Sequence, residues 1–411
     1  MFSLPRLIVD KSALQMLSGE LIEELTLWLS IVVTPTLLRE LVGNLSKHHT
    51  PKKGKLPPET VLRSLAGKLQ RNSAAIPVSF KKLALNELLG SAVEMNGFTI
   101  PVDVTAGNVH SGNKMLMVDG TMQQNLFSRW AVGDHSTVDK FMAGAWREGV
   151  DQIDFSKISG HAKRFVAGYA SNAKNVADVI AAVNSTFADP EQKTQIHLLA
   201  VLLVFLRAEP EYGMLFGALN IAQPKTLLQD FAPYAASVLR LYIVFASCVR
   251  LGFIRRDANS VADLQYLTYT PFATGFVSND DLHRRLFPAT LGTAVFVSSD
   301  ILSADLQRRL EWRKSLSPDE WAAHRRLYGI YPKEFPGSPI NEIWDRTAIP
   351  RKEPPQPTAV DPQAVKSIND DPRLHAMVDA MNQLQEESAA RKSPESTAWP
   401  FGAKPEDTTP L

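Results

Sequence analysis

The N-terminal segment alternates short apolar runs with helical spacing. Residues 7–9 and 31–33 are apolar runs rich in β-branched side chains, which predict short buried strands. Between them, residues 12–29 carry apolar side chains at the spacing of an amphipathic helix. Strand, helix and strand in this order predict a βαβ unit, and therefore a parallel sheet.

Polar residues mark the surfaces and ends of these helices. We expect Glu20, Glu23 and Glu24 to lie on the solvent side of the helix at 12–29. Thr34-Pro35-Thr36 predicts the start of a second helix that runs through Glu40, because proline lacks the N–H that a first helical turn leaves unpaired.

Further strand signals are sparse. Residues 75–80 predict a third strand, and a hairpin is an alternative near residues 98–104. Strand patterns return only at 276–278 and at 294–297.

The middle of the chain is almost entirely helical in pattern. The predicted helices cover residues 121–131, 136–147, 156–169, 173–187, 192–206 and 224–251. We interpret them as an all-helical insertion in an α/β unit. The apolar run at 196–206 is too short to span a bilayer, and the run at 235–254 carries Arg240 and Arg250, so both predict buried helices rather than membrane spans.

The fold class predicted from these patterns is α/β, with a parallel sheet sandwiched by helices. The expected division is a first part of the core (1–60), an uncertain connection with possible strands (61–104), the helical insertion (105–254), a second part of the core (255–348) and a Pro-rich disordered tail (349–411). Within the tail, residues 373–385 form an amphipathic stretch, which indicates either a helix that docks on a partner or a transient solvated helix.

Composition adds few constraints. The 411 residues are 45% hydrophobic with a formal net charge of +1, so no global basic field indicates nucleic-acid binding. The single cysteine, Cys248, lies in an apolar helical stretch and is expected to be a buried thiol. The start of the sequence lacks a secretion-signal pattern, so the cytoplasm is the expected location and no membrane contact is expected.

Four acidic residues stand where strands or helices would present carboxylates to one point. Asp10 follows the first strand, Glu40 lies on the helix after the second, Asp263 is expected to open a helix, and Asp280 ends the run that begins at Phe276. Oxygen ligands at the carboxyl ends of parallel strands suit Mg²⁺ or Mn²⁺.

Each acid alone has an alternative interpretation. Asp263 fits a helix N-terminal acid favoured by the helix dipole, and Glu40 fits a solvated helix residue. Asp281 competes with Asp280, since one residue of register decides which carboxylate points inward. Asp300, at the end of the next predicted strand, is a minor candidate.

Taken in order, these segments resemble the PIN-like nuclease family. Leu7-Ile8-Val9-Asp10-Lys11-Ser12 resembles that family's first strand and its Asp-x-Ser/Thr motif. The segment from Val33 through Leu38-Arg39-Glu40-Leu41 resembles its second strand and the helix with its glutamate. Residues 263–280, ending in Ser278-Asn279-Asp280, resemble its third acid and its strand ending in Ser-x-Asp. The resemblance covers about residues 4–45 and 255–300; a large insertion between the glutamate and the third acid departs from the family's usual compact form.

The resemblance implies a PIN-like α/β core and a metal-dependent nuclease that hydrolyses phosphodiester bonds, with RNA favoured over DNA. It implies Asp10 and Asp280 as central ligands of Mg²⁺ or Mn²⁺, with Glu40 and Asp263 completing the metal site. Hydrolysis would leave a 5′-phosphate and a 3′-hydroxyl. Ser12 and Ser278 would orient ligands or water beside the substrate.

Basic residues are candidates for contacts with the nucleic-acid backbone. Arg284 and Arg285 follow Asp280 directly. The other candidates lie in a loop after the Glu40 helix, which alternatively is only a solvated charged loop: Lys47, His48, His49, Lys52, Lys53 and Lys55.

A rival hypothesis is a non-catalytic PIN-like scaffold. In it the helical region or the C-terminal tail binds a protein partner, and the sheet carries no chemistry. Convergence of the four carboxylates on one point would separate the two hypotheses, since direct metal coordination reaches only about 2–2.6 Å.

Overall fold

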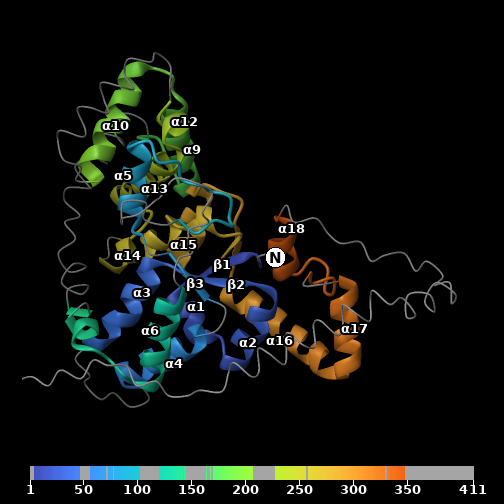
Figure 1. The fold of residues 1–411 in the computed structure, drawn as a ribbon. Coiled ribbons are helices and arrows are strands. Elements are labelled where there is room, and N and C mark those ends of the chain that lie inside the picture. Colours follow the sequence, from blue (N-terminus) through green and yellow to red (C-terminus); the bar gives the residue numbers. More distant parts are fainter. Residues whose placement is uncertain are drawn as a thin grey trace, which may run out of the picture. The chain divides into compact units, whose positions relative to one another are not determined.

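A computed structural model of the chain provides the fold (Figure 1). The structure describes residues 4–46, 56–70, 73–76, 78–101, 120–141, 143–144, 163, 167, 170–206, 227–255, 258–328 and 331–347. All of them belong to one compact unit within residues 1–352.

A five-stranded parallel sheet organises the described residues. Its strands, in chain order, are β1 (Arg6–Val9), β2 (Ser30–Val33), β3 (Ser73–Ala75), β4 (Gly275–Val277) and β5 (Val295–Val297). The order across the sheet is β3-β2-β1-β4-β5, with every neighbouring pair parallel. The predicted α/β class and parallel sheet are confirmed.

Strand β1 lies at the centre of the sheet, and later strands are added on both of its sides. Leu7 pairs with Ile31 of β2 on one side and with Gly275 of β4 on the other. Residues 7–9 are fully buried, as expected for a strand covered on both faces. The chain adds β2 and β3 on one side of β1 and later adds β4 and β5 on the other. The β1–β4 boundary is therefore a topological switch point, where open α/β sheets bind ligands.

Helices make up most of the remaining regular structure. The α-helices are α1 (Lys11–Met16), α2 (Gly19–Trp28), α3 (Pro35–Val42), α4 (Pro58–Leu69), α5 (Phe80–Leu88), α6 (Gly120–Val132), α9 (Val176–Ala188), α10 (Gln192–Leu206), α12 (Leu228–Phe231), α13 (Pro233–Arg250), α14 (Ala258–Leu267), α15 (Asp281–Leu286), α16 (Ser299–Ser315), α17 (Pro318–Tyr328) and α18 (Pro339–Asp345). Short 3₁₀ turns lie at η1 (Gly43–Ser46), η2 (Thr270–Phe272) and η3 (Phe287–Ala289).

Helix packing brings distant parts of the chain together at the sheet. Helix α2 packs against α16, and α3 packs against α14 (Figure 1). Helix α13 of the helical region packs against both α5 and α15, so this region shares the core of the sheet-bearing part. Gly275 permits one close approach, because a Cβ there would lie 2.7 Å from Leu7 Cδ1 and 2.8 Å from Ile343 Cδ1 of α18.

The predicted helix at 12–29 is two helices. Ser18 interrupts it, because the Ser18 side chain accepts a hydrogen bond from Leu21 N at 3.1 Å and caps α2. The expected exposure of Glu24 is wrong. Glu24 is fully buried, where it accepts hydrogen bonds from Trp28 Nε1 at 3.0 Å and from Arg313 Nε at 2.7 Å. The predicted start at Thr34 is confirmed, with Thr34 as the N-cap of α3.

Two further boundaries differ from the prediction. The third strand ends at Ala75, and the Ser79 side chain caps α5, which begins at Phe80. Asp263 does not open a helix: α14 begins at Ala258, so Asp263 lies within it. Residues 98–101 form no strand, and the rest of the hairpin alternative lies outside the described residues.

The described part of the helical region matches the prediction in type. Helices α6, α9, α10 and α13 occupy predicted positions, although the single helix expected at 224–251 is interrupted at Ala232, and Pro233 begins α13. Cys248 is buried, as predicted. Among the described residues, no helix has the length and apolar character needed to cross a membrane.

Several predictions lie outside the described residues. They are the basic loop at 47–55, most of the helix predicted at 156–169, the tail at 349–411 and its amphipathic stretch at 373–385. Of the helix predicted at 136–147, residues 137–141 and 143–144 are helical, which confirms that part of it.

Candidate functional site

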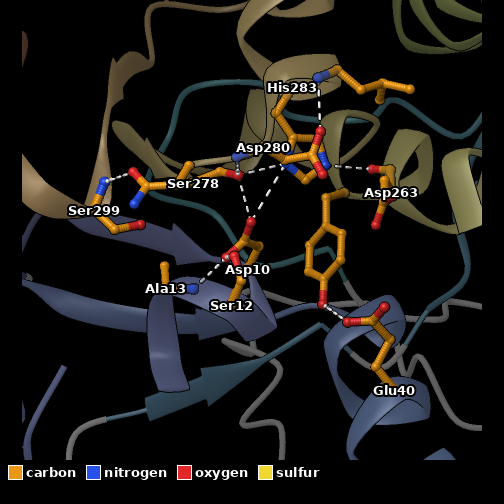
Figure 2. Close-up of polar contacts among 12 residues, drawn as sticks. Asp10, Ser12, Ala13, Glu40, Asp263, Ser278, Asp280, His283 and Ser299 are labelled. Atoms are coloured by element: carbon orange, nitrogen blue, oxygen red, sulfur yellow. Dashed lines mark hydrogen bonds and ion pairs between the residues drawn. The ribbon is translucent and has the colours of Figure 1, made fainter. Parts of the chain in front are cut away.

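The candidate site lies at the carboxyl ends of β1 and β4, at the switch point of the sheet (Figure 2). Asp10 N donates a hydrogen bond to Val277 O at 3.2 Å, which continues the β1–β4 ladder by one residue. Asp10 therefore lies beside Ser278. The name acid cluster is used below for the four predicted acids of this region: Asp10, Glu40, Asp263 and Asp280.

Several donors hold the carboxylate of Asp10. Its Oδ1 accepts a hydrogen bond from Ala13 N at 2.7 Å, so Asp10 caps α1. The same oxygen accepts a second hydrogen bond from Ser12 Oγ at 2.8 Å. Its Oδ2 accepts a hydrogen bond from Ser278 Oγ and lies 3.5 Å from Nδ1 of His283. Burial raises the pKa of Asp10, but the hydrogen bonds from His283, Ser278 and Ala13 outweigh it, so the pKa is lowered. Asp10 is therefore ionised although it is only 4% exposed.

Asp280 is held by the backbone around it. Its Oδ1 accepts a hydrogen bond from Leu282 N at 2.7 Å, so Asp280 caps α15. Its own N–H donates to Ser278 Oγ at 2.9 Å. The Ser-x-Asp spacing noted in the sequence thus corresponds to a compact turn at the end of β4.

Asp281 faces a different direction from Asp280. Its side chain is 61% exposed and forms ion pairs with Arg284 at 3.8 Å and with Arg285 at 2.7 Å. Arg285 also donates to Phe253 O at 3.1 Å. The charge of Asp280 contributes to raising the pKa of Asp263.

Asp263 and Glu40 reach the site from α14 and α3 (Figure 2). The pKa of Asp263 is raised to about 7, chiefly by burial. The positive charge of His283 opposes this increase, and three negative charges add to it: those of Asp280, Glu40 and Asp10. The four predicted acids therefore share one electrostatic environment, although they come from both ends of the described chain.

A tyrosine absent from the sequence prediction holds Glu40. Tyr266 OH donates a hydrogen bond to Glu40 Oε2 at 2.6 Å and thereby joins α14 to α3. Tyr266 is 1% exposed, and its pKa is raised well above the usual range by burial and by the charge of Glu40.

The sequence interpretation also missed His283, which lies among the acids. This residue is 1% exposed. Its Nδ1 lies 2.7 Å from Ser278 Oγ, and its Nε2 lies 2.8 Å from the backbone oxygen of Asp263 (Figure 2). The spacing between Asp280 and His283 could have indicated this position. A residue three positions after the N-cap Asp280 lies in the first turn of α15, near the end of β4.

The donor set suits a hard divalent cation in its chemistry. Carboxylate oxygens are the ligands that Mg²⁺ and Mn²⁺ prefer. The Asp263 carboxylate accepts no hydrogen bond from the residues that the structure describes. Its pKa is raised chiefly by burial and further by three negative charges, which a cation would offset. As the side chains lie, no three His, Cys, Asp or Glu residues of the described ranges are close enough together to hold a metal ion. Coordination would therefore require carboxylates of the acid cluster to move closer together.

The remaining candidates lie at the margin of the site or outside the described residues. Asp300 is exposed in the first turn of α16 and accepts a hydrogen bond from Asn279 Nδ2 at 3.1 Å. The predicted substrate contacts Lys52 and Lys53 are not among the described residues.

Comparisons with known proteins add no assignment. No protein-family model matches the sequence, and neither the curated proteins nor the solved structures searched contain a match.

Proposed function

We propose that the acid cluster binds Mg²⁺ or Mn²⁺ and hydrolyses phosphodiester bonds in nucleic acid. The observation that carries this proposal is a set of acids at the switch point of a parallel sheet, where the charges of Asp280, Glu40 and Asp10 add to burial in raising the pKa of Asp263. Negative charges that act on one another in this way are costly unless a cation offsets them, and perturbed pKa values of this kind gather at functional sites.

The protein prepares its carboxylates for this role. Ser12, Ala13 and Ser278 fix Asp10. Capping of α15 fixes Asp280, and the tyrosine on α14 fixes Glu40. These hydrogen bonds limit the conformational freedom that the three side chains would lose on binding an ion, although the carboxylates must still move closer together to coordinate it.

Asp10, Glu40, Asp263 and Asp280 would hold the ion. A bound Mg²⁺ or Mn²⁺ would supply Lewis acidity and lower the pKa of a coordinated water. The acids would also exclude nucleic acid unless cations screened them, which makes the activity dependent on added metal.

The substrate class follows from the chemistry of the surrounding side chains. Arg284 and Arg285 lie on α15, which begins at the site, and their side chains are 56% and 48% exposed. Guanidinium groups in such a position suit phosphates of a nucleic-acid strand that enters the site. The resemblance to PIN-like nucleases favours RNA over DNA, with a 5′-phosphate and a 3′-hydroxyl as product ends.

One observation favours the rival function, a non-catalytic module that binds a protein. Val132, Val138 and Phe141, at and after the end of α6, are 74%, 68% and 72% exposed. Exposed apolar side chains of this kind are typical of interaction surfaces when they are contiguous.

A cleavage assay separates these functions. Labelled RNA and labelled DNA are incubated with Mg²⁺ or Mn²⁺ and wild-type protein, Asp10→Asn or Asp280→Asn, with Asp319→Asn on the exposed side of α17 as the matched control. We expect each site variant to lose activity on the order of 100-fold, because one charged group at the reacting centre is removed, and we expect the control to keep it. Equal cleavage by all four proteins, each folded by circular dichroism, would contradict the proposal.

A further inference from the structure

His283 contacts three elements of the site, the ends of β4 and β1 and the helix α14. It lies on α15, its Nδ1 contacts Ser278 at the end of β4 and Asp10 at the end of β1, and its Nε2 contacts the backbone of Asp263 in α14. Aromatic rings enclose the imidazole: the ring of Phe276 is edge-on with centroids 5.0 Å apart, and the ring of Tyr266 lies at 5.8 Å. The ring is therefore fixed by packing as well as by its polar contacts.

Both ring nitrogens of His283 act as donors. Nε2 faces a backbone oxygen, which can only accept, so Nε2 carries a hydrogen. Ser278 Oγ has a single proton and donates it to the ionised carboxylate of Asp10. Nδ1, at 2.7 Å from the same Oγ, must then donate as well. The imidazole thus brings a positive charge into the acid cluster.

We propose that His283 is a positioning residue of the acid cluster, which holds the Asp10 carboxylate and the backbone of α14 at Asp263 in fixed relation to each other. This inference rests on the proposed function only in the experiment that measures metal binding. Without the two donors, Ser278 and Asp10 would lose a partner in a buried site, and the hydrogen bond between α15 and the backbone of Asp263 would be lost. The acids would then meet a cation with a less defined geometry.

Metal affinity is the first test. Mn²⁺ is titrated, with the free ion followed by electron paramagnetic resonance, into wild-type protein, His283→Phe and His283→Gln. Phenylalanine keeps an aromatic ring without donors, whereas glutamine keeps an amide donor. The matched control is His324→Gln, which alters a histidine on α17 that pairs with Glu334 outside the site.

Both variants remove the imidazolium charge, which by itself would strengthen cation binding, so the loss of positioning is measured by comparing the two variants. We expect His283→Phe to bind Mn²⁺ roughly 10- to 100-fold more weakly than His283→Gln, the usual effect of removing a group that orients a metal ligand, and we expect the control to bind like wild type. Folded His283→Phe protein that binds Mn²⁺ as tightly as His283→Gln would overturn the inference and leave the proposed function standing.

A thermal double-mutant cycle tests the same contact without metal. The melting temperatures of His283→Phe, Asp10→Asn and the double variant are compared with wild type in the presence of a chelator. A positioning contact predicts that the double variant loses much less than the sum of the two single losses. Additive losses would overturn the inference. If wild-type protein fails to bind Mn²⁺, the proposed function fails, and this cycle alone decides the role of His283.

Discussion

Two buried polar networks in this chain differ in how their charges balance. One is the acid cluster at the ends of β1 and β4. The other, called the Arg309 network below, joins α16 to α18 and consists of Asp305, Arg309, Ser338 and Asn341. Both networks bring together polar groups from distant elements. Only in the Arg309 network are the negative and positive charges equal in number.

The Arg309 network is balanced. Arg309 and Asp305 are both fully buried and pair at 3.2 Å. The guanidinium also donates to Ser338 Oγ and to Asn341 Oδ1, each at 2.6 Å. It lies over the ring of Trp28 at 5.4 Å. A buried charge with this many partners ties elements together, and no ligand is needed to explain it.

The acid cluster is not balanced in the same way. Of the main charges that act on Asp263, three are negative and that of His283 is positive, and the pKa of Asp263 is raised to about 7, chiefly by burial and further by its acidic neighbours. The comparison teaches that a buried charge is not itself a sign of function. Unmatched charge of one sign, placed at a sheet edge where ligands bind, is the informative feature.

The largest expected effect comes from breaking the balanced network. Arg309→Met keeps much of the side-chain volume but leaves Asp305 buried without its principal cation, so the free energy of unfolding should fall by about 3–5 kcal/mol. Urea denaturation measures this loss. Arg308→Met is the matched control, because Arg308 pairs with the same carboxylate at 3.2 Å from a side chain that is 57% exposed. Its loss should stay below about 1 kcal/mol. Equal losses of unfolding free energy in the two variants would mean that burial does not determine how much each ion pair contributes to stability.

Removing one negative charge from the acid cluster should have the opposite effect and raise the free energy of unfolding. Because the folded-state pKa of Asp263 is raised to about 7, ionisation of this group opposes folding, and the cost grows as pH rises from about 4 to about 7. Asp263→Asn should therefore match the stability of wild type near pH 4 and exceed it by up to about 4 kcal/mol at pH 8, since each unit of raised pKa corresponds to about 1.4 kcal/mol.

Urea denaturation in a chelator at both pH values measures this gain, with the exposed Asp281→Asn as control. The same Asp263→Asn variant should bind Mn²⁺ more weakly. A variant less stable than wild type at pH 8 would show that Asp263 is stabilising and that the cluster is balanced.

The smallest expected effect concerns the contact that holds Glu40. Tyr266→Phe removes the hydroxyl that donates at 2.6 Å and should lower the free energy of unfolding by about 1 kcal/mol. It should also weaken Mn²⁺ binding, measured by titration. Tyr331→Phe removes a similar contact, to Asp345 at 2.9 Å, outside the acid cluster and should leave the metal affinity unchanged. Equal metal affinity in both variants would contradict a role for Tyr266 at the site.

The strands and the acids at their ends could be predicted because their signals are local. The apolar runs at 7–9 and 31–33 can be buried on both faces only within a sheet, and a residue directly after such a strand lies at the sheet edge. This argument alone predicts that Asp10 lies at the edge of the sheet. Glu40 followed from the cap at Thr34, which sets the start of α3.

Contacts made in three dimensions could not be predicted in the same way. Glu24 has the helical spacing of a surface residue, but Arg313, almost 290 positions away, pairs with it in the interior. The position of Asp263 within α14 depends on the helix start, for which the sequence offers several competing N-cap residues before Asp263: Asp257, Asn259 and Ser260. His283 became recognisable only when Asp10 and Asp263 were found beside it.

The most direct test of the central claim is anomalous X-ray diffraction from crystals of the full chain soaked in Mn²⁺. The account predicts an anomalous peak within the acid cluster, at about 2.0–2.6 Å from carboxylate oxygens that include Asp263 and at least one of Asp10 and Asp280. Its height should fall sharply in Asp263→Asn crystals. Peaks only at exposed acids elsewhere, with the cluster side chains unmoved at saturating Mn²⁺, would contradict the claim that this cluster is a metal site.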